Sequence, residues 1–138
     1  MTKVYIIDDH NLVVEGILSL FQNEDEISVC GYAKTAQEAL IFFENDLADV
    51  ILMDINLPDM SGLDLCKLLK EKYPNVKILA LSTFNQSSYI SKMMANGASG
   101  YLLKNIAKEE LMEAVKMVMG TESNFPLAAF TISSTSKL

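Results

Sequence analysis

The sequence predicts an α/β fold, a doubly wound sheet of five parallel strands in the order 2-1-3-4-5. Short runs of β-forming residues alternate five times with segments of helical periodicity. Residues 4–7 and 50–53 are continuously apolar, which is typical of parallel strands buried on both faces. Strands joined by helices of about ten residues form right-handed crossovers, and this strand order is usual at such a size.

Each element has its own local signal. We expect strands over residues 3–8, 27–33, 49–54, 76–82 and 99–104, and helices over residues 12–23, 36–45, 63–72, 86–95 and 107–119. Thr35 and Glu38 form a capping box at the start of the second helix, and Gly97 and Gly120 end the last two helices. The stripe of the first helix that we expect to be buried consists of Leu12, Val14, Leu18 and Phe21.

The composition limits the classes of function. The chain has 138 residues and a net charge of −7, and its basic residues are all lysines, so it is a poor candidate for binding nucleic acid by itself. Cys30 and Cys66 lie far apart, as free thiols do in a reducing compartment. No apolar stretch reaches the roughly 18 residues of a membrane span, and the N-terminus opens into a strand. We therefore expect a cytoplasmic protein without a membrane partner.

The chain divides into two parts. Residues 1–120 contain all the strand–helix units and are long enough for one domain with a core. Residues 121–138 are rich in serine and threonine, without clear periodicity, and we expect them to be a linker or tail.

Charged residues stand where three of the apolar runs end. Asp8 and Asp9 follow the first strand, Asp54 closes the third and Lys104 closes the fifth. The carboxyl ends of parallel strands meet at one edge of a sheet, and ligands of such folds bind where the strand order reverses, here between strands 1 and 3. Three carboxylates and an ammonium at that edge predict a Mg²⁺ site with phosphoryl chemistry.

The predicted cation ligands are oxygen atoms. Asp9 and Asp54 are direct ligands, Asp8 binds directly or through water, and Asn56 offers a carbonyl from the loop after strand 3. We interpret His10 as a loop residue or helix cap rather than a ligand or base. Alternatively, the acids cap helices or lie solvated on loops, but this is less consistent with all the charged groups ending strands at one edge.

Asp54 is the predicted nucleophile because its strand is central in the sheet. A carboxylate can form an acyl phosphate when a metal and a cation offset the incoming charge. Lys104 supplies a positive charge for a phosphoryl oxygen or for Asp54, and Ser82, which ends strand 4, can donate a hydrogen bond to the phosphoryl group.

Two other functions use a similar arrangement. A Mg²⁺-dependent phosphatase with an aspartyl-phosphate intermediate usually needs a second acid two residues after the nucleophile, where this chain has Asn56. A flavodoxin-like carrier of FMN needs a phosphate loop after strand 1, where Asp8 and Asp9 would repel the phosphate.

The motifs resemble those of CheY-like receiver domains of bacterial response regulators. The resemblance covers residues 3–119 and rests on Asp8-Asp9-His10, Met53-Asp54-Ile55-Asn56-Leu57-Pro58 with Gly62, Ser82, and Gly97-Ala98-Ser99-Gly100-Tyr101-Leu102-Leu103-Lys104. It implies that Asp54 accepts a phosphoryl group from a sensor histidine kinase or a small donor, and that Asp8 and Asp9 bind Mg²⁺. It also implies a switch formed by Ser82 and Tyr101, and a protein that is not a turnover enzyme.

The motifs around Asp8-Asp9-His10 and at residues 100–104 resemble those of the NarL/LuxR subfamily. Members of that subfamily regulate transcription through a C-terminal helix-turn-helix domain. We expect that domain to be missing here, with residues 121–138 leading toward it; a stand-alone receiver is the alternative. Thr83 replaces the small residue usual after the switch hydroxyl and could narrow access to the phosphoryl group. Asn105 replaces a common proline after Lys104, which favours a trans bond.

We expect a homodimer to form on phosphorylation. The first and last helices have more apolar residues than one buried stripe accommodates, and an exposed apolar patch would suit self-association. The predicted dimer face consists of Val13, Ile17, Leu20, Met112 and Met119. A face formed by helix 4, strand 5 and helix 5 is the alternative.

Overall fold

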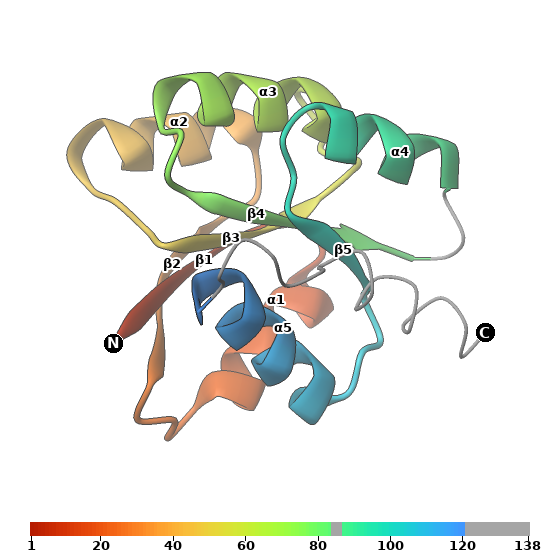
Figure 1. Ribbon diagram of the computed structural model, residues 1–138. Coiled ribbons are helices and arrows are strands. Elements are labelled where there is room, and N and C mark those ends of the chain that lie inside the picture. Colours follow the sequence, from red (N-terminus) through yellow and green to blue (C-terminus); the bar gives the residue numbers. More distant parts are fainter. Residues whose placement is uncertain (84–86, 121–138) are drawn as a thin grey trace.

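The computed structural model describes residues 1–83 and 87–120 and confirms the predicted fold (Figure 1). Its elements are β1 (Thr2–Ile7), α1 (Asn11–Phe21), β2 (Ile27–Ala33), α2 (Ala36–Asn45), β3 (Val50–Asp54), α3 (Gly62–Lys72), β4 (Lys77–Ser82), α4 (Ser87–Ala95), β5 (Gly100–Leu103) and α5 (Lys108–Gly120). The sheet has the order β2-β1-β3-β4-β5, and every neighbouring pair is parallel.

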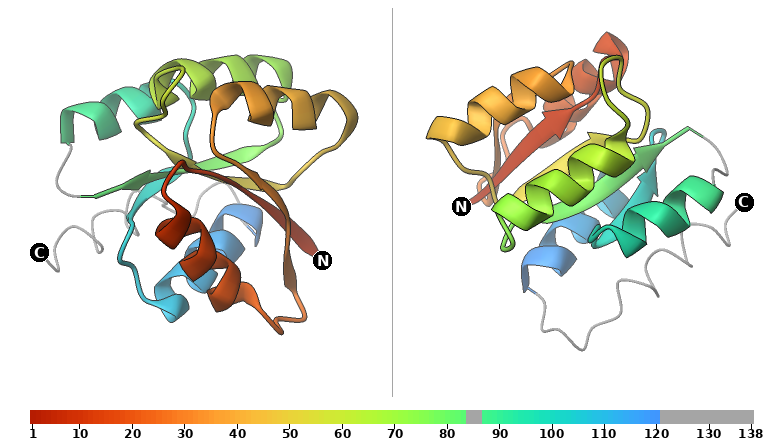
Figure 2. Two further views of the ribbon diagram at one scale, coloured as in Figure 1. Left: turned by 180° about the vertical axis from the view of Figure 1, so that it is seen from behind. Right: turned by 90° about the horizontal axis from the view of Figure 1, so that it is seen from above.

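Helices cover both faces of the sheet. α2, α3 and α4 lie on one face, and α1 and α5 lie on the other (Figures 1 and 2). Successive residues of a strand point to opposite faces, so Tyr5 and Ile7 join the core under α2 and α3, whereas Val4 and Ile6 join the core under α1 and α5. This double burial explains why the central strands are continuously apolar.

Local signals place the helix ends near the predicted residues. The Thr35 hydroxyl oxygen accepts a hydrogen bond of 3.1 Å from the Glu38 N–H, which is the first half of a capping box. The Glu38 carboxylate accepts one of 2.9 Å from the Lys34 N–H, one residue before the N-cap Thr35. Gly97, just after α4, has a φ of 109°, a conformation that glycine adopts without steric cost. Gly120, expected to follow α5, is its last residue.

The buried stripe of α1 differs from the predicted one. Leu12 is 84% exposed, so its assignment to the core was wrong, and Ile17 is only 7% exposed, so it is core rather than exposed surface. The buried residues Val14, Ile17 and Phe21 are spaced by three and four positions and lie on one side of the helix. Leu12 lies two positions before Val14 and therefore faces away from the sheet.

Within residues 1–83 and 87–120, no helix is both long enough and apolar enough to cross a bilayer. None of the peptide bonds of these residues is cis, so the bond between Lys104 and Asn105 is trans, as expected. The predicted tail, residues 121–138, lies outside the described part of the chain.

Candidate functional site

The ends of three strands bring the predicted site residues together. Ile7 pairs with Met53 in the register of β1 and β3, so Asp8 and Asp54, the next residues of each strand, come side by side. The Asp8 N–H continues the pairing with β2 through a 3.0 Å hydrogen bond to the Ala33 carbonyl. The Lys104 N–H donates a 2.8 Å hydrogen bond to the Ser82 carbonyl, which places the lysine at the same edge.

Two of the three carboxylates are buried, and they share one ammonium. Asp8 is fully buried, Asp54 is 3% exposed, and the Asp9 side chain is 36% exposed at the mouth of the site. Lys104 Nζ lies 3.0 Å from Asp8 Oδ2 and 3.2 Å from Asp54 Oδ2, and its side chain is 9% exposed. The buried part of the site therefore combines two potential negative charges with one positive charge.

The excess of negative charge affects the pKa of Asp54. Burial raises the pKa of its carboxyl above the usual range, and the nearby Asp8 carboxylate raises it further. The Lys104 ammonium and a 3.2 Å hydrogen bond from the Asn56 N–H oppose the pKa rise without cancelling it. An additional cation would stabilise the ionised form of Asp54.

The buried oxygens fit a divalent metal ion. Within the described residues, Asp8 Oδ2 and Asp54 Oδ2 accept no hydrogen bond, although Lys104 contacts both at ion-pair distance. One ligand atom from each of Asp8, Asp9, His10 and Asp54 can be chosen so that all lie within 4.8 Å of one another. Unsatisfied carboxylate oxygens in such a group are suitable ligands for a hard cation such as Mg²⁺.

His10 extends into this group, which the sequence analysis did not anticipate. Its backbone occupies the N-cap position of α1, as interpreted, but its side chain makes no capping hydrogen bond. Instead, its Nδ1 lies 2.7 Å from Asp8 Oδ1, 3.3 Å from Asp9 Oδ1 and 3.6 Å from Asp54 Oδ2. The pattern Asp-Asp-His places the ring on the same loop as the acids, but spacing alone does not show which way it turns.

The loop after β3 is held closely against the end of that strand. Asn56 forms an antiparallel bridge with Ser61, and the Gly62 N–H donates a 2.7 Å hydrogen bond to the Ile55 carbonyl. A Cβ at Gly62 would lie 2.5 Å from the Asp54 carbonyl oxygen and 2.6 Å from that of Ile55. The sequence analysis named Gly62 only as part of a motif; its packing role follows from this close approach.

Asp59, which the sequence analysis missed, ties the same loop to α2. Its carboxylate accepts hydrogen bonds from the backbone N–H groups of Ala36 at 2.8 Å and Gln37 at 3.0 Å. These bonds lower the pKa of the Asp59 carboxyl. The sequence around Asp59 contains no signal for this contact, because Asp59 and the first two residues of α2 are 23 and 22 residues apart in the chain.

A cavity of about 390 Å³ opens at the site. Asp9, Asp54, Asn56 and Lys104 line it, and so do His10, Leu57, Pro58 and Thr83. Ser82 is 1% exposed at the end of β4, and the exposed Thr83 rather than Ser82 lines the cavity. Thr83 and Asp54 therefore line the same cavity.

Tyr101 already points inward in this structure. It is 9% exposed, packs in the core between the sheet and the helices α2 to α4, and its burial raises the pKa of its hydroxyl. The resemblance implies a switch role for Tyr101, and that role stays a prediction.

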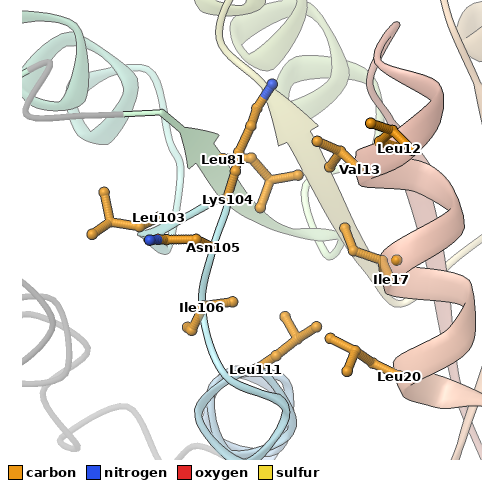
Figure 3. Close-up of a pocket in the computed structure, with 11 residues that line it drawn as sticks. Leu12, Val13, Ile17, Leu20, Leu81, Leu103, Lys104, Asn105, Ile106 and Leu111 are labelled. Atoms are coloured by element: carbon orange, nitrogen blue, oxygen red, sulfur yellow. The ribbon is translucent and has the colours of Figure 1, made fainter.

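The predicted dimer-face residues do not line one surface feature. Val13, Ile17 and Leu20 line an apolar groove of about 310 Å³ between α1 and the loop after β5, where Lys104 extends toward the strand ends (Figure 3). Met112 lines a separate cavity beside Lys108 and Lys116, and Met119, which is 40% exposed, lines a third beside Tyr73.

A doubly wound sheet with an acidic pair after β1, an aspartate at the end of β3 and a lysine after β5 defines the receiver class of signalling domains. The chain belongs to the response regulator receiver domain family, whose model matches residues 4–116. This confirms the family predicted from the motifs. Members of this family bind Mg²⁺ in an acidic pocket, and they are not typical turnover enzymes.

Two similar proteins are named as transcriptional regulatory proteins. The chain is 40% identical over 116 residues to the transcriptional regulatory protein DegU of Brevibacillus brevis, covering 84% of this chain and 49% of that protein. It is 39% identical over 118 residues to the transcriptional regulatory protein LnrK of Bacillus subtilis, covering 86% and 54%. The chain thus spans about half the length of these relatives.

Solved structures agree with the fold. A LuxR-family two-component response regulator from Aurantimonas matches with a TM-score of 0.80 and 26% identity, covering all of both chains. A LuxR-family DNA-binding response regulator from Staphylococcus aureus matches with a TM-score of 0.78 and 25% identity, covering 86% of this chain and 98% of that one. Both similarities agree with the predicted NarL/LuxR subfamily.

Proposed function

We propose that residues 1–120 form a phosphoacceptor domain in which Asp54 receives a phosphoryl group from a sensor histidine kinase or a small phosphodonor. The observation that carries the proposal is the pair of buried carboxylates, Asp8 and Asp54. Their Oδ2 atoms accept no hydrogen bond within the described residues, and both lie at ion-pair distance from the Lys104 ammonium. Such a pair favours a divalent cation, and an accessible carboxylate beside that cation favours attack on phosphorus.

Mg²⁺ is the proposed cofactor. Asp8, Asp9 and Asp54 would hold it through carboxylate oxygens, and Asn56 through its backbone carbonyl, as an oxygen-seeking cation requires. When bound, the ion neutralises charge on the phosphoryl oxygens. The Asp54 oxygen forms a bond to phosphorus while the bond from phosphorus to the donor breaks, and the donor leaves with that electron pair.

Lys104 is the proposed counter-charge of the phosphorylated state. In the unphosphorylated chain its ammonium is shared between Asp8 and Asp54 at 3.0 and 3.2 Å. Transfer of a phosphoryl group places new negative oxygens near the lysine, and its ammonium can then pair with one of them. Ser82, at the end of β4, is the proposed hydrogen-bond donor to another.

The domain would retain the phosphoryl group rather than turn it over. Asn56 is exposed two residues after Asp54, and an amide is not the acid that a phosphatase would place there to protonate its leaving group. Thr83 on the cavity wall would further limit the approach of water. The Mg²⁺-dependent phosphatase is therefore the less favoured function for this site.

The proposed output is control of transcription in the cytoplasm. The relatives are named as transcriptional regulators, and this chain covers only about half their length, so DNA contact would require a further domain beyond the linker that we propose for residues 121–138. Phosphorylation would promote a homodimer. The switch would work through Ser82, Thr83 and Tyr101, with contacts that differ between the two states.

The test is phosphorylation by acetyl phosphate with Mg²⁺, followed by intact-mass measurement. Wild type should gain the mass of one phosphoryl group, Asp54→Ala should gain none, and Asp64→Ala, which changes an exposed acid of α3, should behave as wild type. No gain in wild type, or an equal gain in Asp54→Ala, would show that the assignment of the nucleophile is wrong.

A further inference from the structure

We propose that His10 is a direct ligand of the metal through Nδ1, and that the site consequently prefers a divalent transition ion such as Mn²⁺ over Mg²⁺. This inference rests on the metal site proposed above and adds a nitrogen ligand to it. The resemblance to the family assigns metal binding to Asp8 and Asp9, whereas the role of His10 follows from the position of its ring nitrogen in this chain.

The position of the ring nitrogen fits a shared ion. Ligands in adjacent positions around a six-coordinate ion with bonds of about 2.1 Å lie about 3 Å apart. His10 Nδ1 lies 2.7 Å from Asp8 Oδ1, 3.3 Å from Asp9 Oδ1 and 3.6 Å from Asp54 Oδ2. All three separations are near that spacing, so one ion could contact the nitrogen and the three carboxylates once the Lys104 ammonium, which lies 3.0 Å from Nδ1, moves away.

The backbone holds the imidazole at this place. The His10 N–H donates a 2.8 Å hydrogen bond to Asp8 Oδ1, and the His10 carbonyl accepts the first hydrogen bonds of α1 from Val13 and Val14. The residue is therefore fixed on both sides, by the acid pair and by the helix. Its side chain remains 56% exposed and has room to adjust when an ion enters.

The two nearest neighbours of Nδ1 make opposite demands on it. Lys104 Nζ lies 3.0 Å from Nδ1, and an ammonium requires a lone pair there, whereas the carboxylate of Asp8 at 2.7 Å requires a proton. One nitrogen cannot meet both needs at once. A divalent ion among these groups would accept the lone pair of Nδ1 and the carboxylate oxygens together, which resolves the conflict.

The ligand set determines the preferred metal. Carboxylate, carbonyl and water oxygens suit both Mg²⁺ and Mn²⁺, whereas an imidazole nitrogen suits transition ions such as Zn²⁺, Fe²⁺ and Ni²⁺ and is foreign to the all-oxygen coordination of Mg²⁺. In a site with three carboxylates and one imidazole, the imidazole therefore adds to the binding of a transition ion such as Mn²⁺ but contributes little to the binding of Mg²⁺. The identity of the ion that supports phosphorylation would then depend on His10.

The direct test is the electron spin-echo envelope modulation of Mn²⁺ bound to the full, untagged chain. His10 is the only histidine of the sequence, so an imidazole ¹⁴N signal identifies it without ambiguity. Wild type should show ¹⁴N coupling, and His10→Ala should lack it. Mn²⁺ bound to wild type without ¹⁴N coupling would overturn the proposal.

Affinities provide the second measurement, by titration calorimetry with MnCl₂ and MgCl₂. His10→Ala should weaken Mn²⁺ binding by a factor at least about tenfold larger than its effect on Mg²⁺ binding. Asp9→Asn should weaken both metals, and Glu15→Gln, an exposed acid of α1, should change neither. Equal weakening of both metals by His10→Ala would contradict the proposal. Phosphorylation of wild type with Mg²⁺ tests the proposed function, and the ¹⁴N signal tests the ligand role of His10. Either result can be negative while the other is positive.

Discussion

Asp54 lies in surroundings that oppose its own charge. Its carboxylate is 3% exposed, it is close to Asp8, and it shares the Lys104 ammonium with that residue. These surroundings raise its pKa, which means that the ionised side chain destabilises the folded state. The residue that we propose to carry the chemistry is thus also a cost to stability, as is common at functional sites.

Asp54→Asn should therefore stabilise the metal-free chain at neutral pH. We expect the free energy of unfolding to rise by about 1 kcal/mol, which corresponds to an increase in Tm of about 4 °C. Thermal unfolding in buffer with a chelator measures this change.

The pH dependence provides the control. Folding raises the pKa of Asp54 above its ordinary 3.8, so its destabilising effect is fully present above the folded pKa and fades as pH falls toward 3.8. The stability difference between Asp54→Asn and wild type should shrink in that window. A difference that is constant with pH, or a less stable Asp54→Asn at neutral pH, would refute this account of the charge.

Lys104→Ala should destabilise the chain. Removal of the ammonium leaves two buried carboxylates without their partner, and breaking a buried ion pair costs about 3 kcal/mol. Chemical denaturation measures the change. In the Asp54→Asn background the same substitution should cost at least about 1 kcal/mol less, because one of the two charges is already gone; strictly additive effects would contradict the shared ion pair.

The sequence predicted the positions of those site residues that stand at the ends of strands. Asp8, Asp9, Asp54 and Lys104 were placed correctly because the ends of parallel strands must meet at one edge. The direction of the His10 ring was not predictable, since it depends on a backbone turn and on the pull of nearby charges.

At the scale of elements, the loop from β3 to α3 holds Asp54, the proposed nucleophile, in place. It returns to the strand through the hydrogen bond from Gly62 to Ile55 and is tied to α2 by Asp59. The backbone of Gly62 packs against the carbonyl oxygen of Asp54 itself. Any displacement of this loop would therefore move Asp54.

Gly62→Ala should destabilise the chain by about 3 kcal/mol, because its Cβ would lie 2.5 Å from a backbone oxygen that cannot easily move. Gly16→Ala is the matched control, since a Cβ there meets nothing within 4 Å inside α1. It should stabilise the chain by about 0.5–1 kcal/mol. Urea unfolding of both variants tests the pair, and a Gly62→Ala as stable as Gly16→Ala would show that the close packing is wrong.

Elements were predictable where local chemistry determines them. The helix over residues 36–45 was predicted with its observed bounds, because Thr35 and Glu38 define its start within four residues. The stripe of α1 was assigned incorrectly at Leu12 and Ile17, because apolar residues surround that helix and periodicity alone does not select the buried side.

At the scale of the whole molecule, the sheet separates two helical layers. α1 and α5 share one face, so an interface on them lies opposite α2 (Figure 1). No observation tests the predicted dimer face. Ile17 is buried, so it is not an exposed member of that face. Met119 remains its most exposed member at 40%.

Met119→Asp should weaken dimerisation of the phosphorylated chain by at least about tenfold in Kd if that face forms the interface, because a charge would be buried without a partner. Ile41→Asp changes a residue of α2 that is 54% exposed on the opposite layer, and it should dimerise as wild type does. Light scattering during size-exclusion chromatography measures both. Normal dimerisation of Met119→Asp would instead favour the face of α4, β5 and α5.

The central claim is that the phosphoryl group resides on Asp54 and on no other acid of the cluster. Reduction of the phosphorylated chain with borohydride converts an acyl phosphate to homoserine, and peptide sequencing by mass spectrometry then locates the converted residue. We predict conversion at Asp54 alone, and none when a chelator removes the metal. Conversion at Asp8 or Asp9 instead of Asp54 would contradict the account.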